Sequence, residues 1–246
     1  MSEAVKHGIL RGVGVGPGDP ELMTLKAVRM IGAAPVAAWF AKAGHLGHAR
    51  AIAARWLTPR HIEIAMHYPM TTEVPVADAA YAIALDNFYD AQAEAVAGHL
   101  RAGRDVSVLC EGDPMFYGSF MHLFVRLKDR FATEICAGVT GMAGCWAAAR
   151  QPMCWGDNVV SAIPGTLPPE TLAAQLKLSN AAVVLKLGRN FEKVCAAIAE
   201  SGRLDEAIYV ERGTMAGERI APLRDMRGKP VPYFALILIP GRKERR

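Results

Sequence analysis

Short apolar runs rich in β-branched residues alternate along the chain with longer segments that mix polar and apolar residues. The runs are typical of buried strands, and the mixed segments are typical of helices that cover a sheet. In the segment before Ala102, apolar residues repeat near 3.6-residue spacing and would share one helix face: Ile83, Ala84, Phe88, Ala91 and Ala95. The expected strands are 9–15, 36–40, 61–66, 106–109, 133–136, 159–163, 182–187, 207–210 and 234–239, and the helices between them are expected to end near 32, 57, 102, 128, 178 and 202.

This alternation of strands and helices predicts an α/β fold with largely parallel sheets. The spacing of the turns indicates two α/β domains. We place the boundary within residues 117–120, where Gly118 and Ser119 weaken the helical pattern. The expected domains are therefore an N-terminal one at 1–117 and a C-terminal one at 118–246.

Glycine turns follow several of the expected strands. The central one reads Cys-Glu-Gly-Asp-Pro-Met-Phe-Tyr-Gly-Ser-Phe at 110–120. Gly112 permits a sharp turn and the close approach of a ligand, while Asp113 is expected to cap a helix whose first position is Pro114. A similar turn, Gly-Pro-Gly-Asp-Pro at 16–20, is expected to let Asp19 cap a helix from Glu21. Turns at the carboxyl ends of strands are where α/β proteins usually bind ligands.

Two common nucleotide-binding motifs are excluded at the first turn. A Rossmann fingerprint fails because Pro17 stands where the third glycine belongs, and because the next strand ends in Ala-Ala-Trp-Phe at 37–40 without an acidic residue for a ribose. A Walker phosphate loop fails because no Gly-Lys-Ser/Thr follows. Each turn taken singly is explained by helix capping, whereas five turns at strand ends favour a shared ligand site.

Composition narrows the class of protein further. The 246 residues are 52% hydrophobic with a net charge of +4, which fits a globular chain with an anionic ligand. Nucleic-acid binding is not indicated, because the sequence has no stripe of basic residues interleaved with aromatic ones. A membrane span is not indicated either, because apolar stretches such as 231–240 are shorter than the roughly 20 residues that cross a bilayer. Five cysteines without a Cys-x-x-Cys pair predict reduced thiols in a cytoplasmic protein. His45 and His48 lack acidic or cysteine partners nearby, so we expect no metal site.

The set of turns resembles the motifs of the tetrapyrrole (class III) S-adenosylmethionine-dependent methyltransferases of cobalamin and sirohaem synthesis. The resemblance covers essentially the whole chain. It rests on Gly-Val-Gly-Pro-Gly-Asp-Pro at 14–20 followed by Leu-Met-Thr-Leu-Lys-Ala at 22–27, Glu-Gly-Asp-Pro at 111–114, Gly-Val-Thr at 138–140, Lys-Leu-Gly-Arg-Asn at 186–190 and Glu-Arg-Gly-Thr at 211–214. Within the family, residues 111–120, with glutamate before the glycine, are most similar to members that methylate precorrin-2.

The resemblance implies two α/β domains with S-adenosylmethionine in the cleft between them, a tetrapyrrole substrate and a homodimer. Much of the cofactor contact in the family is made by backbone, in agreement with the many glycines. Gly141 departs from relatives that often carry a larger residue there, so its contact is expected through the main chain. The family's cofactor contacts carry over to Pro17, Glu111, Gly112, Asp113, Phe116, Thr140, Gly141, Leu187 and Gly213.

The resemblance implies methyl transfer to a carbon, which needs alignment of the reactants rather than a protein nucleophile. A base that removes the proton from the methylated carbon is left open: the candidates are Glu111, Tyr117, the histidines at 45, 48 and 67, and water. Arg189 and Arg212 are candidates to pair with substrate carboxylates, and the long loop at 67–75 is expected beside the site. A cobalt-containing substrate, uroporphyrinogen, a diphthamide precursor or ribosomal RNA, and a non-catalytic nucleotide-binding role remain alternatives.

Overall fold

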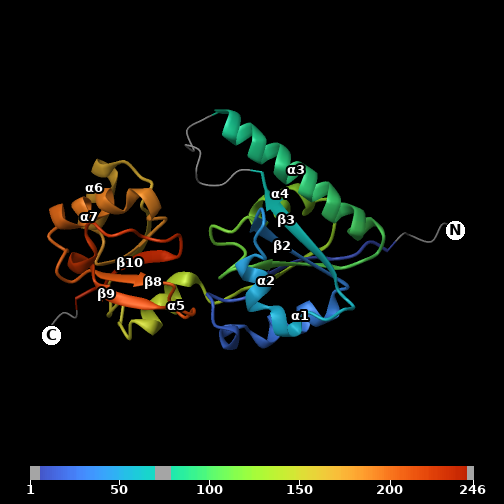
Figure 1. The fold of residues 1–246 in the computed structure, drawn as a ribbon, viewed down its shortest axis with the longest axis horizontal. Coiled ribbons are helices and arrows are strands. Elements are labelled where there is room, and N and C mark those ends of the chain that lie inside the picture. The colour runs from blue at the N-terminus through green and yellow to red at the C-terminus, as the bar shows by residue number, and fades with distance from the viewer. Residues whose placement is uncertain (1–5, 70–78, 243–246) are drawn as a thin grey trace. The chain divides into compact units, whose positions relative to one another are not determined.

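The computed structural model describes residues 6–69 and 79–242 (Figure 1). Packing contacts divide the chain into two compact units, unit 1 (Met1–Thr140) and unit 2 (Gly141–Arg246), each built from strands and helices, so the predicted α/β class is confirmed. The elements of unit 1 are β1 (Leu10–Gly14), α1 (Leu25–Ala33), β2 (Val36–Lys42), α2 (His48–Ile52), β3 (Ile62–Tyr68), α3 (Ala79–Arg101), β4 (Val106–Cys110), α4 (Phe120–Leu127) and β5 (Thr133–Cys136), with 3-10 helices at Pro20–Leu22 and Ala54–Trp56.

The strands described in unit 1 form one parallel sheet in the order β3-β2-β4-β1-β5. Its faces are covered by different helices: α3 and α4 lie on one face, and α1 and α2 on the other (Figure 1). Alternation along β1 shows this division, since Leu10 packs with the α3 and α4 residues while Val13 packs with those of α1 and α2. Burial on both faces accounts for the continuous apolar strands in the sequence.

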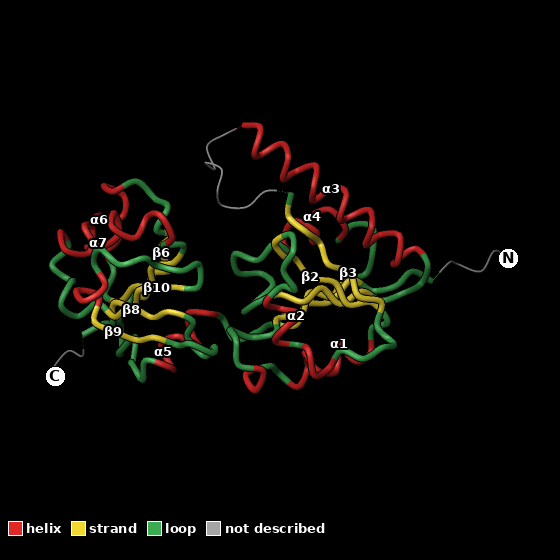
Figure 2. Tube along the Cα trace, viewed as in Figure 1, coloured by secondary structure: helices red, strands yellow, loops and turns green. Residues whose placement is uncertain are grey.

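Unit 2 has a mixed sheet in the order β6-β7-β10-β8-β9. β6 and β7 pair in parallel, but β10 runs antiparallel to β7 and β8, and β9 antiparallel to β8. Figure 2 shows α6 and α7 on one face and α5 on the other. The elements are α5 (Gly141–Ala148), β6 (Val160–Pro164), α6 (Pro169–Leu178), β7 (Ala181–Leu185), α7 (Phe191–Glu200), β8 (Ile208–Glu211), β9 (Arg219–Pro222) and β10 (Ala235–Ile239), with 3-10 helices at Gly188–Asn190 and Leu223–Met226.

The prediction of largely parallel sheets therefore holds for unit 1 and is wrong for unit 2. The strand β9 was not predicted, because it is short and ends in Pro222. It follows β8 after a short turn, and a connection of that length joins antiparallel strands, whereas a parallel pair needs a crossover of a dozen or more residues.

The division between the units also differs from the predicted boundary at 117/118. The structure divides the chain after Thr140, because α4 and β5 belong to the first unit. Phe120, Leu123 and Leu127 of α4 are fully buried in its core, and β5 pairs with β1 along its length. Gly118 and Ser119 thus mark the start of a helix rather than a boundary.

Two helix starts differ from their predicted positions. No helix follows Asp113 directly: residues 113–118 form a turn, and α4 begins at Phe120. Asp19 caps only the 3-10 helix Pro20–Leu22, accepting from the Glu21 N–H at 2.8 Å. The first α-helix begins afterwards, where the Thr24 hydroxyl accepts from the Ala27 N–H at 3.1 Å. In both turns proline follows the capping aspartate without starting an α-helix.

Three glycines meet where β1, β4 and β5 end, and we call this the glycine junction: Gly14, Gly112 and Gly138. A Cβ atom on Gly138 would lie 2.0 Å from the Gly112 carbonyl oxygen and 2.9 Å from the Gly14 Cα. A Cβ on Gly14 would lie 2.6 Å from the same oxygen. The Gly112 N–H donates to the Gly16 carbonyl at 2.8 Å, which links the turns after β4 and β1. The backbones are therefore too close for any side chain.

We predict that Gly138→Ala lowers the free energy of unfolding by about 1–3 kcal/mol or more, because its methyl group would overlap backbone that cannot move aside easily. Gly98→Ala is the matched control, since Gly98 lies on the exposed side of α3 and no described atom lies within 4 Å of its added Cβ. That control should gain roughly 0.5–1 kcal/mol. Chemical denaturation measures both, and equal stabilities for the two variants would contradict the close approach.

Candidate functional site

The turns after three neighbouring strands of unit 1 lie at one edge of the sheet. β4, β1 and β5 are adjacent and parallel, so the residues that follow them share the carboxyl edge: Pro17 after β1, Glu111 after β4 and Thr140 after β5. The chain leaves β1 towards β2 on one side and leaves β4 towards β5 on the other. Such a reversal is where open α/β sheets bind ligands. The fold therefore brings Pro17, Glu111 and Thr140, which were predicted from the sequence as cofactor contacts, to the same edge of the sheet.

Asp113 holds the turn after β4 in place. Its Oδ1 accepts from the Met115 N–H at 2.9 Å and its Oδ2 from the Gly138 N–H at 3.0 Å. One carboxylate therefore closes its own turn and also ties that turn to the one after β5. The second bond joins residues 25 apart in the sequence. Asp113 is thus a tertiary link, and not the cap of an α-helix as the sequence predicted.

Glu111 carries a carboxyl group suited to proton transfer near neutral pH. The residue keeps part of its surface in contact with solvent, while neighbouring protein atoms remove part of the hydration of its carboxyl group. This desolvation raises the pKa of Glu111 from 4.5 to about 7, although the nearby backbone N–H of Ala49 in α2 opposes the rise. A group with a pKa near 7 exists in both protonation states at neutral pH, as a general acid or base requires.

Tyr117 presents an aromatic side chain from the same turn. The residue is 47% exposed, and its ring meets the ring of Phe116 edge-on, with 4.8 Å between centroids. Its backbone adopts a left-handed φ of 54°, which is uncommon for a residue other than glycine. Strained residues of this kind persist where the surrounding structure holds them, and they cluster at functional sites. Nothing in the sequence indicated this conformation.

In unit 2, the predicted contacts Leu187 and Gly213 follow β7 and β8. Both strands run antiparallel to β10 between them, so they point the same way and their turns share an edge. Leu187 is 1% exposed as a whole residue: its side chain packs in the core, and its carbonyl accepts from the Asn190 N–H at 2.7 Å. A Cβ on Gly213 would lie 2.6 Å from Cys145 Sγ of α5, so this glycine is required by packing. At Gly141 an added Cβ would meet no described atom within 4 Å.

Strain and positive charge also gather at this edge of unit 2. Lys186, Arg212 and Thr214 have left-handed φ angles of 57°, 49° and 67°. The last is an outlier for a β-branched residue, and its N–H donates to Glu218 Oε2 at 2.7 Å. Lys186, Arg189 and Arg212 are exposed. Three cationic side chains thus surround the turns that carry Leu187 and Gly213, and the sequence had singled out only the two arginines.

Two other predicted residues lie on neighbouring elements of unit 1. His67 is exposed near the end of β3, and His48 begins α2. Residues 70–75 of the predicted loop lie outside the described residues. Among residues 6–69 and 79–242, no group of three or more His, Cys, Asp or Glu side chains is placed to hold a metal ion. The cysteines are free, and all but Cys154 are buried; burial raises the pKa of Cys145 to about 12.

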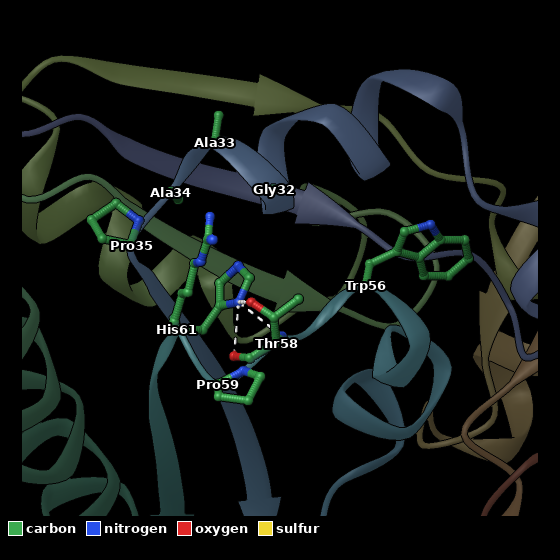
Figure 3. A pocket seen from close by; sticks show the side chains of 9 residues that line it. Gly32, Ala33, Ala34, Pro35, Trp56, Thr58, Pro59 and His61 are labelled. Carbon is green, nitrogen blue, oxygen red and sulfur yellow. Dashed lines mark hydrogen bonds between the residues drawn. The ribbon is translucent and has the colours of Figure 1, made fainter.

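A pocket of about 690 Å³ lies at the opposite, amino edge of the unit 1 sheet (Figure 3). It is formed where α1 ends and where β2 and β3 begin. The ring of His61 is turned towards Thr58, and its two nitrogens bond to the Thr58 N–H at 3.0 Å and the Ile31 carbonyl at 3.1 Å. Because none of the strand-end turns reaches this edge, the pocket is separate from the candidate site. Its lining residues are Gly32, Ala33, Ala34, Pro35, Trp56, Thr58, Pro59, Arg60 and His61.

Comparison with known proteins identifies the family. Residues 10–226 match the family of tetrapyrrole (corrin/porphyrin) methylases. The chain is 51% identical over 238 residues to a precorrin-2 C(20)-methyltransferase of Sinorhizobium sp, covering 97% of each protein. It is 28% identical over 240 residues to a cobalt-precorrin-2 C(20)-methyltransferase of Salmonella typhimurium, covering 95% of this chain and 96% of that protein. The chain therefore belongs to the tetrapyrrole methylase family, and it is an S-adenosylmethionine-dependent C-methyltransferase.

Solved structures agree in fold. A cobalt precorrin-4 methyltransferase matches with a TM-score of 0.73 at 22% identity, covering 97% of each chain. A uroporphyrin-III C-methyltransferase from Thermus thermophilus, in complex with S-adenosylhomocysteine, matches with a TM-score of 0.65 at 24% identity, covering 95% of this chain and 92% of that one. Within the described residues, no helix is both long and apolar enough to cross a membrane.

We predict that Asp113→Ala destabilises unit 1 by about 1–3 kcal/mol, because the Met115 and Gly138 N–H groups both lose their acceptor. Asp113→Asn should fall between Asp113→Ala and the wild type, since one amide oxygen replaces two carboxylate oxygens and its NH₂ group faces the other N–H. Chemical denaturation measures the free energies of unfolding of the three proteins and so ranks their stabilities. Calorimetry should show weaker S-adenosylhomocysteine binding by both variants. Wild-type stability in both would mean that the Gly138 bond does not hold the turn.

We predict that Glu111→Gln raises the thermal midpoint of unfolding more at pH 8 than at pH 5. With its pKa raised to about 7, folded Glu111 keeps a proton that the unfolded chain releases above about 4.5. Wild-type stability therefore falls as pH rises through this interval, whereas glutamine stays neutral. Thermal unfolding of both proteins from pH 4 to 9 gives the difference at each pH. A difference that does not change with pH would show that the carboxyl is not desolvated.

Proposed function

We propose that this chain transfers one methyl group from S-adenosylmethionine to carbon 20 of precorrin-2, giving precorrin-3A and S-adenosylhomocysteine, in cobalamin biosynthesis. The observation that carries this proposal is the 51% identity, over 97% of both proteins, with a precorrin-2 C(20)-methyltransferase. The lower identity of 28% with a relative named for the cobalt-containing substrate favours the metal-free one. The same comparison favours precorrin-2 over uroporphyrinogen, diphthamide precursors and RNA.

The methyl donor would be held by the strand-end turns that carry the family motifs. Its contacts would be Pro17, residues 111–113, Phe116 and Thr140 from unit 1, and Gly141, Leu187 and Gly213 from unit 2. The glycines of the turns support binding by main-chain groups, as a neutral adenosyl moiety allows. Bound S-adenosylhomocysteine in a family member of the same fold supports the choice of ligand.

The chemistry proposed needs no nucleophile from the protein. The bridging carbon of the tetrapyrrole forms the new bond to the methyl group, and the sulfonium sulfur keeps the electron pair of the bond that breaks. The protein's part is to align the two reactants in line, which can contribute about 7–11 kcal/mol in favourable systems. This requirement fits turns held by backbone contacts, such as those at the glycine junction.

A proton leaves the methylated carbon afterwards, and Glu111 is our first candidate for the base. Its raised pKa of about 7 makes its carboxylate a better proton acceptor than an ordinary one. Tyr117, on the same turn, is the second candidate. If Glu111 is the base, the rate should rise with pH through about 7 in the wild type and lose that dependence in Glu111→Gln.

Substrate carboxylates would pair with the exposed cations of unit 2. Arg189 and Arg212 present planar guanidinium groups, which bind carboxylates in two-pronged geometry, and Lys186 adds a third charge. A homodimer and a cytoplasmic location complete the proposal, in line with the family resemblance. The non-catalytic alternative has less support, because the turns that carry the family motifs are intact.

The decisive experiment incubates the protein with precorrin-2 and methyl-labelled S-adenosylmethionine. We expect the product to gain one methyl group by mass spectrometry, with the label at carbon 20 by NMR. Uroporphyrinogen and cobalt-loaded precorrin-2 serve as parallel substrates. Turnover of cobalt-loaded substrate alone would move the protein to the relative that acts on that compound, and a label at carbon 2 or 7 of uroporphyrinogen would move it to the sibling reaction.

A further inference from the structure

Three hydroxyl groups from distant parts of unit 1 meet beside the turn that carries Tyr117. Tyr68 ends β3, Tyr89 lies in α3, and Ser119 precedes α4. The Ser119 Oγ is hydrogen-bonded to the Tyr68 hydroxyl, and it accepts from the Tyr89 hydroxyl at 3.3 Å. We call these residues the hydroxyl cluster. The cluster joins the carboxyl end of an edge strand, the longest helix described and the start of α4.

Aromatic packing keeps the two tyrosines in place. The Tyr68 ring stacks on Phe40 with 5.6 Å between centroids, and Tyr89 meets Phe40 edge-on at 5.8 Å. Tyr89 also stacks against His122 of α4, with 4.0 Å between ring centroids and 8° between ring planes. Tyr89 is only 6% exposed. Its hydroxyl therefore has a fixed position, and so has the serine oxygen that it meets.

Ser119 occupies a position where serine normally caps a helix. A capping serine accepts a hydrogen bond from a backbone N–H in the first helical turn. Within the described residues, its side chain caps no N–H of α4, and its backbone φ and ψ of −66° and −18° are helical rather than extended. The hydroxyl is used instead for the tertiary bonds to the tyrosines. The loss of a helix cap indicates that the hydrogen bonds between Ser119 and the tyrosines contribute more to the structure than a cap on α4 would.

The segment just before Ser119 is strained and tightly closed. Tyr117 holds its left-handed φ of 54°, and a Cβ on Gly118 would lie 3.0 Å from the Pro114 carbonyl oxygen. Asp113 fixes the first end of this turn through Met115 and Gly138. A strained conformation persists only when contacts on both sides determine it, and the hydroxyl cluster supplies the contact at the second end.

We propose that the hydroxyl cluster is a positioning device that fixes the turn at 113–118 from its far end, so that the Tyr117 ring is held in place for the methyl-transfer reaction. Tyr68, Tyr89 and Ser119 act through Tyr117 and are positioning residues, not catalytic ones. The part that concerns catalysis rests on the proposed function. Cofactor affinity should depend on the Asp113 end of the turn, and turnover on the hydroxyl cluster.

The test compares Ser119→Ala and Tyr89→Phe with the matched control Ser107→Ala. The Ser107 hydroxyl is buried in β4 of the same unit and donates to the Met30 carbonyl at 3.2 Å, so its loss also removes one buried hydrogen bond. Hydrogen exchange by mass spectrometry follows the peptides that cover 113–122. We expect exchange there to rise about tenfold in Ser119→Ala over the control, as loss of about one net hydrogen bond allows.

Kinetics then separate positioning from simple destabilisation. In Ser119→Ala, kcat should fall about tenfold while the Kd for S-adenosylhomocysteine stays within about twofold of the wild type, and Ser119→Thr should restore kcat because it keeps the hydroxyl. Exchange equal to that of Ser107→Ala would overturn the proposal, and so would raised exchange with unchanged kcat. If the wild type does not methylate precorrin-2, the proposed function fails, while the exchange comparison still decides whether the cluster fixes the turn.

Discussion

The candidate site depends on how closely three backbone turns approach one another at the end of the unit 1 sheet. At the glycine junction, a side chain on Gly138 would reach within 2.0 Å of a carbonyl oxygen, so the turns after β1, β4 and β5 are packed backbone to backbone. This contact costs conformational entropy, because glycine loses more freedom on folding than any other residue. Asp113 offsets part of that cost by bonding to Met115 and Gly138 with its two oxygens.

The glycine junction leaves two candidate functional side chains exposed on the turn after β4, those of Glu111 and Tyr117. Because the backbones of the turns after β1, β4 and β5 are in close contact, the short turn that carries Glu111 and Tyr117 cannot readily change its conformation. One consequence is electrostatic: the desolvated Glu111 carboxyl has its pKa raised to about 7. The other is conformational: Tyr117 retains a left-handed φ that a mobile loop would abandon. Both are costs to stability, of the kind that natural proteins accept at functional sites.

Sequence patterns predicted the parts that local chemistry decides. Apolar runs located the strands that the structure describes in unit 1, and glycines located the turns after β1, β4 and β5, because both signals lie within a few neighbouring residues. Contacts between residues far apart in the sequence could not be predicted in this way. Because β5 pairs with β1, the boundary between the units lies after Thr140 and not after 117 as predicted. The antiparallel position of β10 between β7 and β8 was likewise not predicted. The bond from Asp113 to Gly138 belongs to the same class, since helix capping explained the aspartate equally well.

The two units hold the backbone of their strand-end turns in different ways. Unit 1 relies on glycine and on one carboxylate that bonds to two turns. In unit 2 non-glycine residues adopt left-handed backbone beside the predicted contacts: Lys186 directly before Leu187, and Arg212 and Thr214 on either side of Gly213. A side chain kept at a strained position implies that the side chain is needed there, because glycine would remove the strain. Two of these three residues are cations, so the strain keeps positive charge displayed at this edge of unit 2, as the proposed binding of an anionic tetrapyrrole would require.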